Sequence, residues 1–258
     1  MGKTKKRKKK KKKSGLLKAV RIIAIIVIAL CAGYIGWWLI NSARLKNASQ
    51  EAARLYTSEA EALEGEDSSG FQVDFTALKE VSEDVAAWIR MPGIEVIDYP
   101  VVHYNDEYYL NHSWQGEYSA HGAIFIEEIN SPDFTDYHTV IYGHKMLDGS
   151  MFGSLRSYED AEYYVENGGL IYIYTPETSL TYEIFAVEYV TAADPVVYTV
   201  FFSPGEEYTA FLSAMSDRAI YDTGVSVSDT DRVLTLSTCS QRENVRFTVH
   251  AKLIEGEP

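Results

Sequence analysis

Cys239 is the only cysteine of this 258-residue chain outside its N-terminal apolar segment. It closes the sequence Thr235-Leu236-Ser237-Thr238-Cys239, at the end of a run rich in apolar and β-branched residues. A lone thiol with no disulfide partner is either an inert buried side chain or a nucleophile. A cysteine nucleophile needs a proton acceptor, or a cation that lowers the thiol pKa, and histidine commonly supplies both.

His144 is the histidine best placed to serve Cys239. It lies in Ile141-Tyr142-Gly143-His144-Lys145-Met146, just past the end of a short apolar run. Residues that leave a strand for a loop tend to lie at a rim, where binding and catalytic sites are built. Because 95 residues separate His144 from Cys239, only the tertiary fold can bring the two side chains together.

Arg246 is a third candidate for the same chemistry. Strand alternation along residues 245–250 places Arg246, Thr248 and His250 on one face and the apolar residues on the other. If this strand pairs with the strand that ends at Cys239, the guanidinium can approach the thiol and stabilise a developing oxyanion. An ordinary surface arginine on a half-exposed strand is the alternative, and the local sequence leaves both interpretations open.

The elements that must position these residues are mostly strands. Apolar and alternating runs predict strands over 94–102, 123–127, 139–142, 170–175, 180–190, 232–238 and 245–254. Helices are expected over 43–63, 75–89, 151–158 and 206–220, mainly from the spacing of their apolar residues. Many strands with few helices predict a mainly β fold, a closed or nearly closed β-barrel with attached helices.

The N-terminal region differs sharply from the rest of the chain. Residues 1–21 carry 12 basic and no acidic side chains, whereas the remainder carries 12 basic and 37 acidic ones. Residues 22–40 contain no charge, and 19 helical residues span about 29 Å, close to the hydrocarbon thickness of a bilayer. With lysines on one side only, we expect an uncleaved anchor, a cytoplasmic N-terminus and an exported acidic body. A cleaved signal peptide is the alternative.

The remaining polar residues give weaker signals. His103, His112, His121, His138 and His250 show no spacing typical of metal ligands, and we expect surface or partly buried side chains. Acidic pairs such as Glu127-Glu128 are expected to be solvated. We therefore predict no metal and no other cofactor. A role for the lysine run in binding nucleic acid is less economical than a role in topology and in contact with anionic lipids.

Taken together, these motifs resemble those of the class B sortases. Six segments carry the resemblance, in order along residues 71–255: Trp88-Ile89 with Pro92-Gly93, Asp98-Tyr99-Pro100-Val101-Val102, Tyr142-Gly143-His144, Met151-Phe152 after Asp148-Gly149, Thr235 to Cys239 as the TLxTC signature, and Arg246-Phe247-Thr248-Val249. The resemblance implies a closed sortase β-barrel of about eight strands. It also implies a helix-containing insertion before the cysteine strand, and residues 203–221 fit it. Residues 105–110 resemble part of a substrate groove, but their polar residue is shifted by one position, so no role is carried over.

The resemblance also implies roles for individual residues. Cys239 resembles the nucleophile that cleaves a C-terminal sorting signal after threonine and forms a thioacyl intermediate. His144 resembles the general acid/base, and Arg246 the residue that binds the oxyanion or orients the substrate. Thr238 and Tyr142 occupy positions that lie near the substrate in the family.

The implied reaction is transpeptidation at the cell membrane. The implied partners are secreted proteins with a sorting signal and an amino group of a lipid-linked peptidoglycan precursor or cross-bridge, with no nucleic acid. The expected organisation is a cytoplasmic basic tail (1–21), a transmembrane anchor (22–40), a helical and flexible connector (41–70) and a catalytic domain (71–258). Two other functions stay open: a cysteine peptidase on the same scaffold, and a non-catalytic, membrane-tethered binding domain.

Overall fold

The computed structural model describes residues 18, 20–37, 51–59, 70–239, 244–256 and 258. The chain divides into two compact units, Met1–Asn47 and Ala48–Pro258. In the first unit, a helix over Val20–Trp37 has a mean hydropathy of 2.2 and is exposed along its length. It is long and apolar enough to cross a membrane, as expected for residues 22–40. The basic tail and residues 38–50 of the expected anchor and connector lie outside the described residues, except Lys18, Val20 and Arg21.

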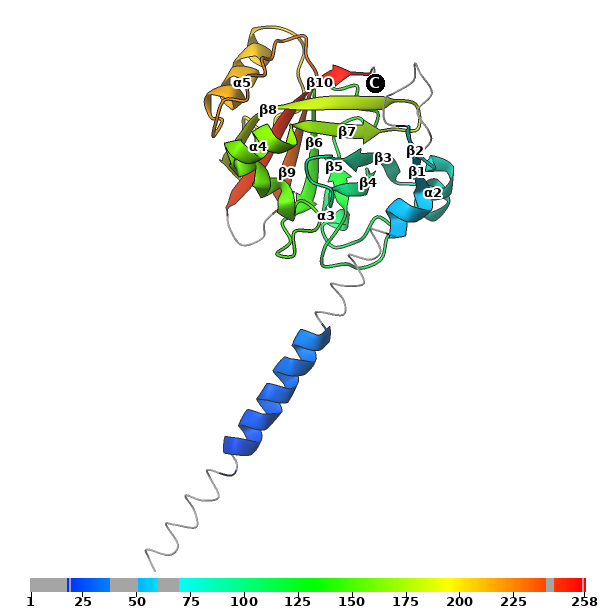
Figure 1. Cartoon of the computed structure of the whole chain (residues 1–258), viewed down its shortest axis with the longest axis vertical. Coiled ribbons are helices and arrows are strands. Elements are labelled where there is room, and N and C mark those ends of the chain that lie inside the picture. Colours follow the sequence, from blue (N-terminus) through cyan, green and yellow to red (C-terminus); the bar gives the residue numbers. More distant parts are fainter. Residues whose placement is uncertain (1–17, 19, 38–50, 60–69, 240–243, 257) are drawn as a thin grey trace, which may run out of the picture. The chain divides into compact units, whose positions relative to one another are not determined.

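The second unit is built on a closed, eight-stranded barrel, which confirms the predicted fold (Figure 1). Its strands are β3 (Val85–Arg90), β4 (Asp98–Val102), β5 (Ile124–Ile126), β6 (His138–His144), β7 (Leu170–Tyr174), β8 (Ser179–Thr191), β9 (Val233–Cys239) and β10 (Val245–Glu255). They close in the order β10-β8-β7-β3-β4-β5-β6-β9. Neighbours are antiparallel except for the parallel pairs β4–β5 and β6–β9. The second parallel pair joins the predicted histidine and cysteine strands.

Alternation along the strands fills the barrel. Leu234 and Leu236 of β9 and Phe247 and Val249 of β10 are fully or almost fully buried in the central core. The residues between them face the outside of the barrel, because successive strand side chains point to opposite faces. On the β6-β9-β10-β8 side this outer face includes a group of buried polar residues: Thr235, Ser237, Thr248, His250 and Glu188.

The prediction of one helix over residues 75–89 was wrong. Helix α2 (Phe75–Val81) ends at Ser82, whose backbone is extended, and β3 follows at Val85. Strand β3 is buried on both faces, with Ile89 in the barrel core and Trp88 in a second apolar cluster outside it. A strand covered on both faces loses its two-residue alternation, and its apolar residues then continued the helical spacing of α2 by coincidence.

The predicted helix over 43–63 was also too long. Residues 51–56 are helical, but Thr57–Glu59 form strand β1, which pairs with β2 (Phe71–Val73). Residues 43–50 and 60–63 lie outside the described part of the chain. The β1–β2 pairing joins segments that are distant in sequence, so helix propensity alone could not reveal it.

Four short helices complete the unit: α3 (Asp106–Tyr109), the 3₁₀ helix η1 (Gly153–Glu159), α4 (Ala161–Asn167) and α5 (Glu206–Asp217). Helix α3 and helix α4 were not predicted, whereas η1 and α5 fall where helices were expected. Helix α5 belongs to the insertion before β9 and buries Phe211, Leu212 and Met215 against β8 and β9. It therefore covers part of the outer face of the barrel (Figure 1).

Candidate active site

Strands β6 and β9 bring together the two residues that the sequence singled out. Their parallel register pairs Tyr142 with Ser237 and, at the ends of both strands, His144 with Cys239. Neighbouring strands lie about 4.8 Å apart, so the backbones of His144 and Cys239 are direct neighbours. Because parallel strands end at the same edge of a sheet, both residues lie where the chain leaves the barrel for its loops.

Strand β10 places Arg246 at the same edge. It runs antiparallel to β9 and therefore begins where β9 ends. The amide of Phe247 donates a hydrogen bond to the hydroxyl of Thr238 (3.0 Å), and Arg246 lies one residue further toward the edge where β9 ends. Phe247 packs in the core, so Arg246 faces outward, as the alternation predicted. The structure thus gathers all three backbone positions at one end of the barrel.

The ring of His144 is held in a close-fitting cradle. Its Nε2 lies 2.7 Å from the carbonyl oxygen of Leu110, the residue that ends α3. A carbonyl only accepts, so Nε2 carries a hydrogen, and in the neutral ring Nδ1 holds the lone pair. Gly122 forms the other wall, with φ of +59° and room for no side chain: a Cβ there would lie 2.8 Å from Cδ2 of His144. The cradle fixes both the tautomer and the orientation of the ring.

The two predicted substrate-binding positions have different surroundings. The half-buried Tyr142 donates a hydrogen bond to Oε2 of Glu127 (2.7 Å), and its ring stacks on Tyr198 at 6.1 Å. Burial and the neighbouring Glu127 raise the pKa of Tyr142, so the phenol stays neutral. Thr238 is buried, and its hydroxyl bonds to the amide and carbonyl of Phe247. Thr238 joins β9 to β10, and its contact with substrate stays a prediction.

An acidic cluster lies beside Tyr142 and was not recognised as such in the sequence. Burial, followed by the charge and hydrogen bond of Glu127 and the charge of Glu128, raises the pKa of Asp106 to about 7. The amide of Glu128 donates to Oδ1 of Asp106 (3.0 Å). Glu128 is exposed, in line with the solvated acidic pair that the sequence predicts, whereas Glu127 is partly buried and accepts a hydrogen bond from Tyr142. Asp106 comes from α3, whose last turn leads to Leu110 and the His144 cradle.

Three histidines are more buried than the sequence indicated. His138 and His250 are fully buried and are hydrogen-bonded to each other through Thr235. His121 is 6% exposed, and neither of its ring nitrogens has a hydrogen-bond partner among the described residues. For His250, the alternation along residues 245–250 predicted its position on the outer face, the same face as Arg246. No group of three or more histidine, cysteine or acidic side chains gathers as a metal site in the described part of the chain.

Comparison with known proteins agrees with this geometry. Residues 89–254 match the model of the sortase domain. Sortase B of Listeria monocytogenes is 32% identical over 246 residues, which cover 92% of this chain and 96% of that protein. Among solved structures, sortase B of Bacillus anthracis superposes with a TM-score of 0.72 at 30% identity, covering 84% of this chain and 99% of that one.

A structure described as a complex of Staphylococcus aureus sortase B with substrate superposes with a TM-score of 0.66 at 27% identity. That match covers 70% of this chain and 85% of the other. Family model, relatives and fold agree along the same barrel, and they extend over most of the chain. This chain therefore belongs to the sortase family of cysteine transpeptidases, and within it to the class B sortases.

Proposed function

We propose that this sortase is anchored in the cell membrane by the helix at Val20–Trp37, with its N-terminus in the cytoplasm and its barrel outside. In this orientation it cleaves the C-terminal sorting signal of a secreted protein after threonine. It then joins that protein to an amino group of a peptidoglycan precursor or cross-bridge. The observation that carries the chemistry is the parallel register of β6 and β9, which makes His144 the cross-strand neighbour of Cys239.

In the first half-reaction, the Cys239 thiol transfers its proton to Nδ1 of His144 as sulfur attacks the threonyl carbonyl. Nδ1 is the proton-carrying atom because Nε2–H is donated to Leu110. A C–S bond forms, and the developing oxyanion is stabilised by the guanidinium of Arg246. The C–N bond then breaks, and the leaving amine takes the proton from His144.

In the second half-reaction, the incoming amine attacks the thioester carbonyl and gives its proton to His144. The new amide forms, the C–S bond breaks, and the thiolate of Cys239 recovers the proton. Dividing one amide exchange into two steps through a covalent intermediate is the gain from nucleophilic catalysis. Tyr142 and the acidic cluster beside it line the approach to this edge, and we propose that Tyr142 contacts the bound peptide.

The test uses the detergent-solubilised full chain and a peptide library in which only threonine is fixed, with and without triglycine as the amine. Intact and peptide-level mass spectrometry should find a thioester on Cys239 carrying a fragment that ends in threonine. With triglycine, the fragment should appear as a new amide. The Cys239→Ala variant serves as the control and should give neither product.

Two outcomes would contradict the proposal in different ways. A fragment that stays a free acid at saturating triglycine would make the enzyme a cysteine peptidase. A thiol that no peptide acylates, and that reacts with iodoacetamide only after unfolding, would make the domain non-catalytic.

A further inference from the structure

A partly buried ionic network lies on the outer face of the barrel, near the catalytic candidates: Glu188 and His250 are buried, whereas Asp194 is partly exposed and Arg218 is exposed. Tyr142, Ser237, Thr248 and Glu188 are consecutive cross-strand neighbours on β6, β9, β10 and β8. Two residues further along these strands, on the same face, lie His144, Cys239 and Arg246. Glu188 is 1% exposed, and burying a carboxylate is costly unless it is paired and hydrogen-bonded.

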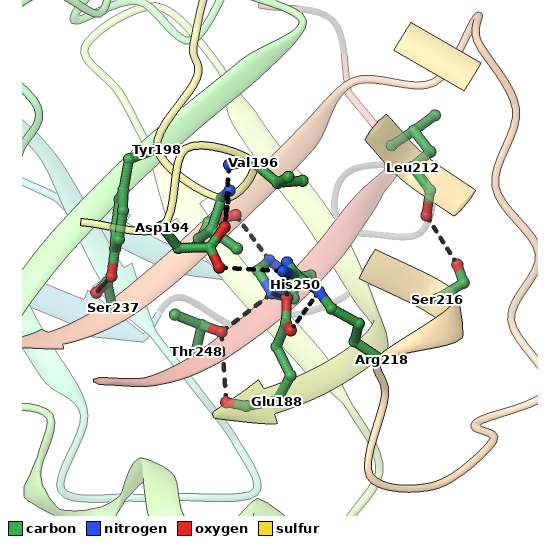
Figure 2. Close-up of polar contacts among 12 residues, drawn as sticks. Glu188, Asp194, Val196, Tyr198, Leu212, Ser216, Arg218, Ser237, Thr248 and His250 are labelled. Carbon is green, nitrogen blue, oxygen red and sulfur yellow. Dashed lines mark hydrogen bonds and ion pairs between the residues drawn. The ribbon is translucent and has the colours of Figure 1, made fainter. Parts of the chain in front are cut away.

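Three ionisable side chains surround Glu188 or extend from it (Figure 2). Nε2 of His250 and Nη2 of Arg218 lie 3.1 and 2.9 Å from Oε1 of Glu188. Nε of Arg218 lies 2.9 Å from Oε2 of Glu188, as an ion pair without a hydrogen bond. Arg218 continues to Asp194 through Nη1–Oδ2 at 3.1 Å. We call Glu188, His250, Arg218 and Asp194 the ionic network.

Hydrogen-bond geometry fixes the protons at one end of the network. Nδ1 of His138 lies 2.7 Å from the carbonyl of Thr199, so Nδ1 is the donor. Burial lowers the pKa of His138 to about 3, so the ring is neutral and Nε2 accepts. The hydroxyl of Thr235 therefore donates to that Nε2 (2.7 Å). Its oxygen is then left to accept from Nδ1 of His250 (2.9 Å).

The other nitrogen of His250 must also carry a hydrogen. Nε2 faces the carboxyl of Glu188, and it lies 3.1 Å from the hydroxyl oxygen of Thr248. That hydroxyl points its own hydrogen to the carbonyl of Glu188 (3.4 Å), so its oxygen accepts from Nε2. The guanidinium of Arg218 is a partner for a carboxylate rather than a carboxylic acid. The ring of His250 thus links the hydroxyl of Thr235 to the carboxyl group of Glu188.

The network ends on the loop of residues 192–202, which we call the Tyr198 loop. Oδ1 of Asp194 accepts from the amides of Val196 and Val197 at 2.9 and 3.0 Å and so folds the start of this loop. The hydrogen bond from His138 to Thr199 holds the loop at a second point. Between these two tethers, the hydroxyl of Tyr198 lies 2.9 Å from that of Ser237, two residues before Cys239.

We propose that the ionic network is a positioning device, which holds the Tyr198 loop in the geometry that receives the sorting-signal peptide. This inference rests on the proposed function, since it concerns how the same site accepts its peptide. Exposed ion pairs contribute little to stability, and replacing a buried pair with apolar residues is often neutral or stabilising. Stability alone therefore gives little reason for the exposed Arg218 to join the buried Glu188 to Asp194. The ionic network instead connects Glu188, which lies near the catalytic candidates, with the Tyr198 loop. The tyrosine of this loop stacks on Tyr142.

The test is a double-mutant cycle between Arg218, which binds Glu188 and Asp194, and Tyr198, which binds Ser237. The full chain is assayed with the best peptide from the threonine library, in the variants Arg218→Ala, Tyr198→Phe and the double. Each single variant should raise KM about tenfold, as for loss of one hydrogen bond of ordinary strength, with kcat within twofold. The double variant should raise KM no further than either single one. Arg218→Lys, which keeps the charge, should fall between wild type and Arg218→Ala.

A second measurement separates this inference from the proposed function. Alkylation of Cys239 by iodoacetamide, followed at the peptide level, needs no peptide groove and should stay within twofold of wild type in every variant. Asp194→Asn keeps the Oδ1 acceptor for the loop amides but removes the ion pair, and it should reproduce the KM effect even if Arg218→Ala fails to fold. An unchanged KM in Asp194→Asn and Arg218→Lys, or additive effects in the cycle, would overturn the inference. Failure of all peptides to acylate wild-type Cys239 would instead overturn the proposed function.

Discussion

Replacing Gly122 with alanine tests whether the His144 cradle matters for the reaction. At φ of +59°, a Cβ would lie 2.6 Å from the carbonyl oxygen of Tyr109, 2.8 Å from Cδ2 of His144 and 3.0 Å from the carbonyl oxygen of Leu110. The two oxygens belong to the backbone, which gives little. The imidazole ring is the part that can move, and restoring a contact of about 3.5 Å requires a shift of about 0.7 Å.

The expected magnitude has two parts. Left-handed backbone costs a residue with a side chain about 1–2 kcal/mol, and overpacking adds about 1–3 kcal/mol. We therefore expect Gly122→Ala to lower the free energy of unfolding by about 2–5 kcal/mol. A catalytic group displaced by about 1 Å costs on the order of 100-fold, so kcat/KM should fall about 10- to 100-fold at temperatures where the variant is folded.

Gly224→Ala is the control. Gly224 also has a positive φ, +78°, but a Cβ there would meet nothing within 4 Å. This variant should show only the backbone cost of about 1–2 kcal/mol, with unchanged kcat/KM. The assay pairs chemical denaturation with initial transpeptidation rates for both variants. Wild-type kcat/KM in folded Gly122→Ala, or equal losses in the two variants, would refute the role of the cradle.

Three further results are expected. Because the pKa of Asp106 is raised to about 7, the folded chain holds a proton between about pH 4 and 7 that unfolded aspartate lacks. The free energy of unfolding should therefore fall as pH rises through this window, and urea titrations should show a flatter profile for Asp106→Asn; equal slopes would contradict it. Tyr142→Phe removes the hydroxyl that donates to Glu127. The free energy of unfolding should fall by about 1–3 kcal/mol, and KM should rise. Unchanged values of both would exclude the proposed contact of Tyr142 with the peptide. Trp88 is fully buried, and its indole nitrogen donates to Asp98 (2.6 Å). Trp88→Phe should lower the free energy of unfolding, measured by thermal denaturation, by about 1–4 kcal/mol without changing KM. A changed KM would show that the second apolar cluster affects the site.

Much of the fold and two of the key positions could be predicted from sequence because they depend on local patterns. Alternation in residues 245–250 gave the outward face of Arg246, and the apolar residues of 206–220 gave α5. Apolar length alone identified the helix at Val20–Trp37. The same local reasoning failed at residues 75–89, since a strand buried on both faces carries no alternation that could distinguish it from the preceding helix.

What the sequence determined by itself was the chemistry available: one thiol in its motif, one histidine at a strand end, one arginine on an alternating strand, and an apolar segment long enough to cross a membrane. The tertiary structure alone decided which of these groups meet. The parallel β6–β9 register, the cradle made by Leu110 and Gly122, and the ionic network from Glu188 to Asp194 all join residues far apart along the chain. Their physical cause is the closure of the barrel, which sets strand neighbours and register through contacts that no window of sequence contains.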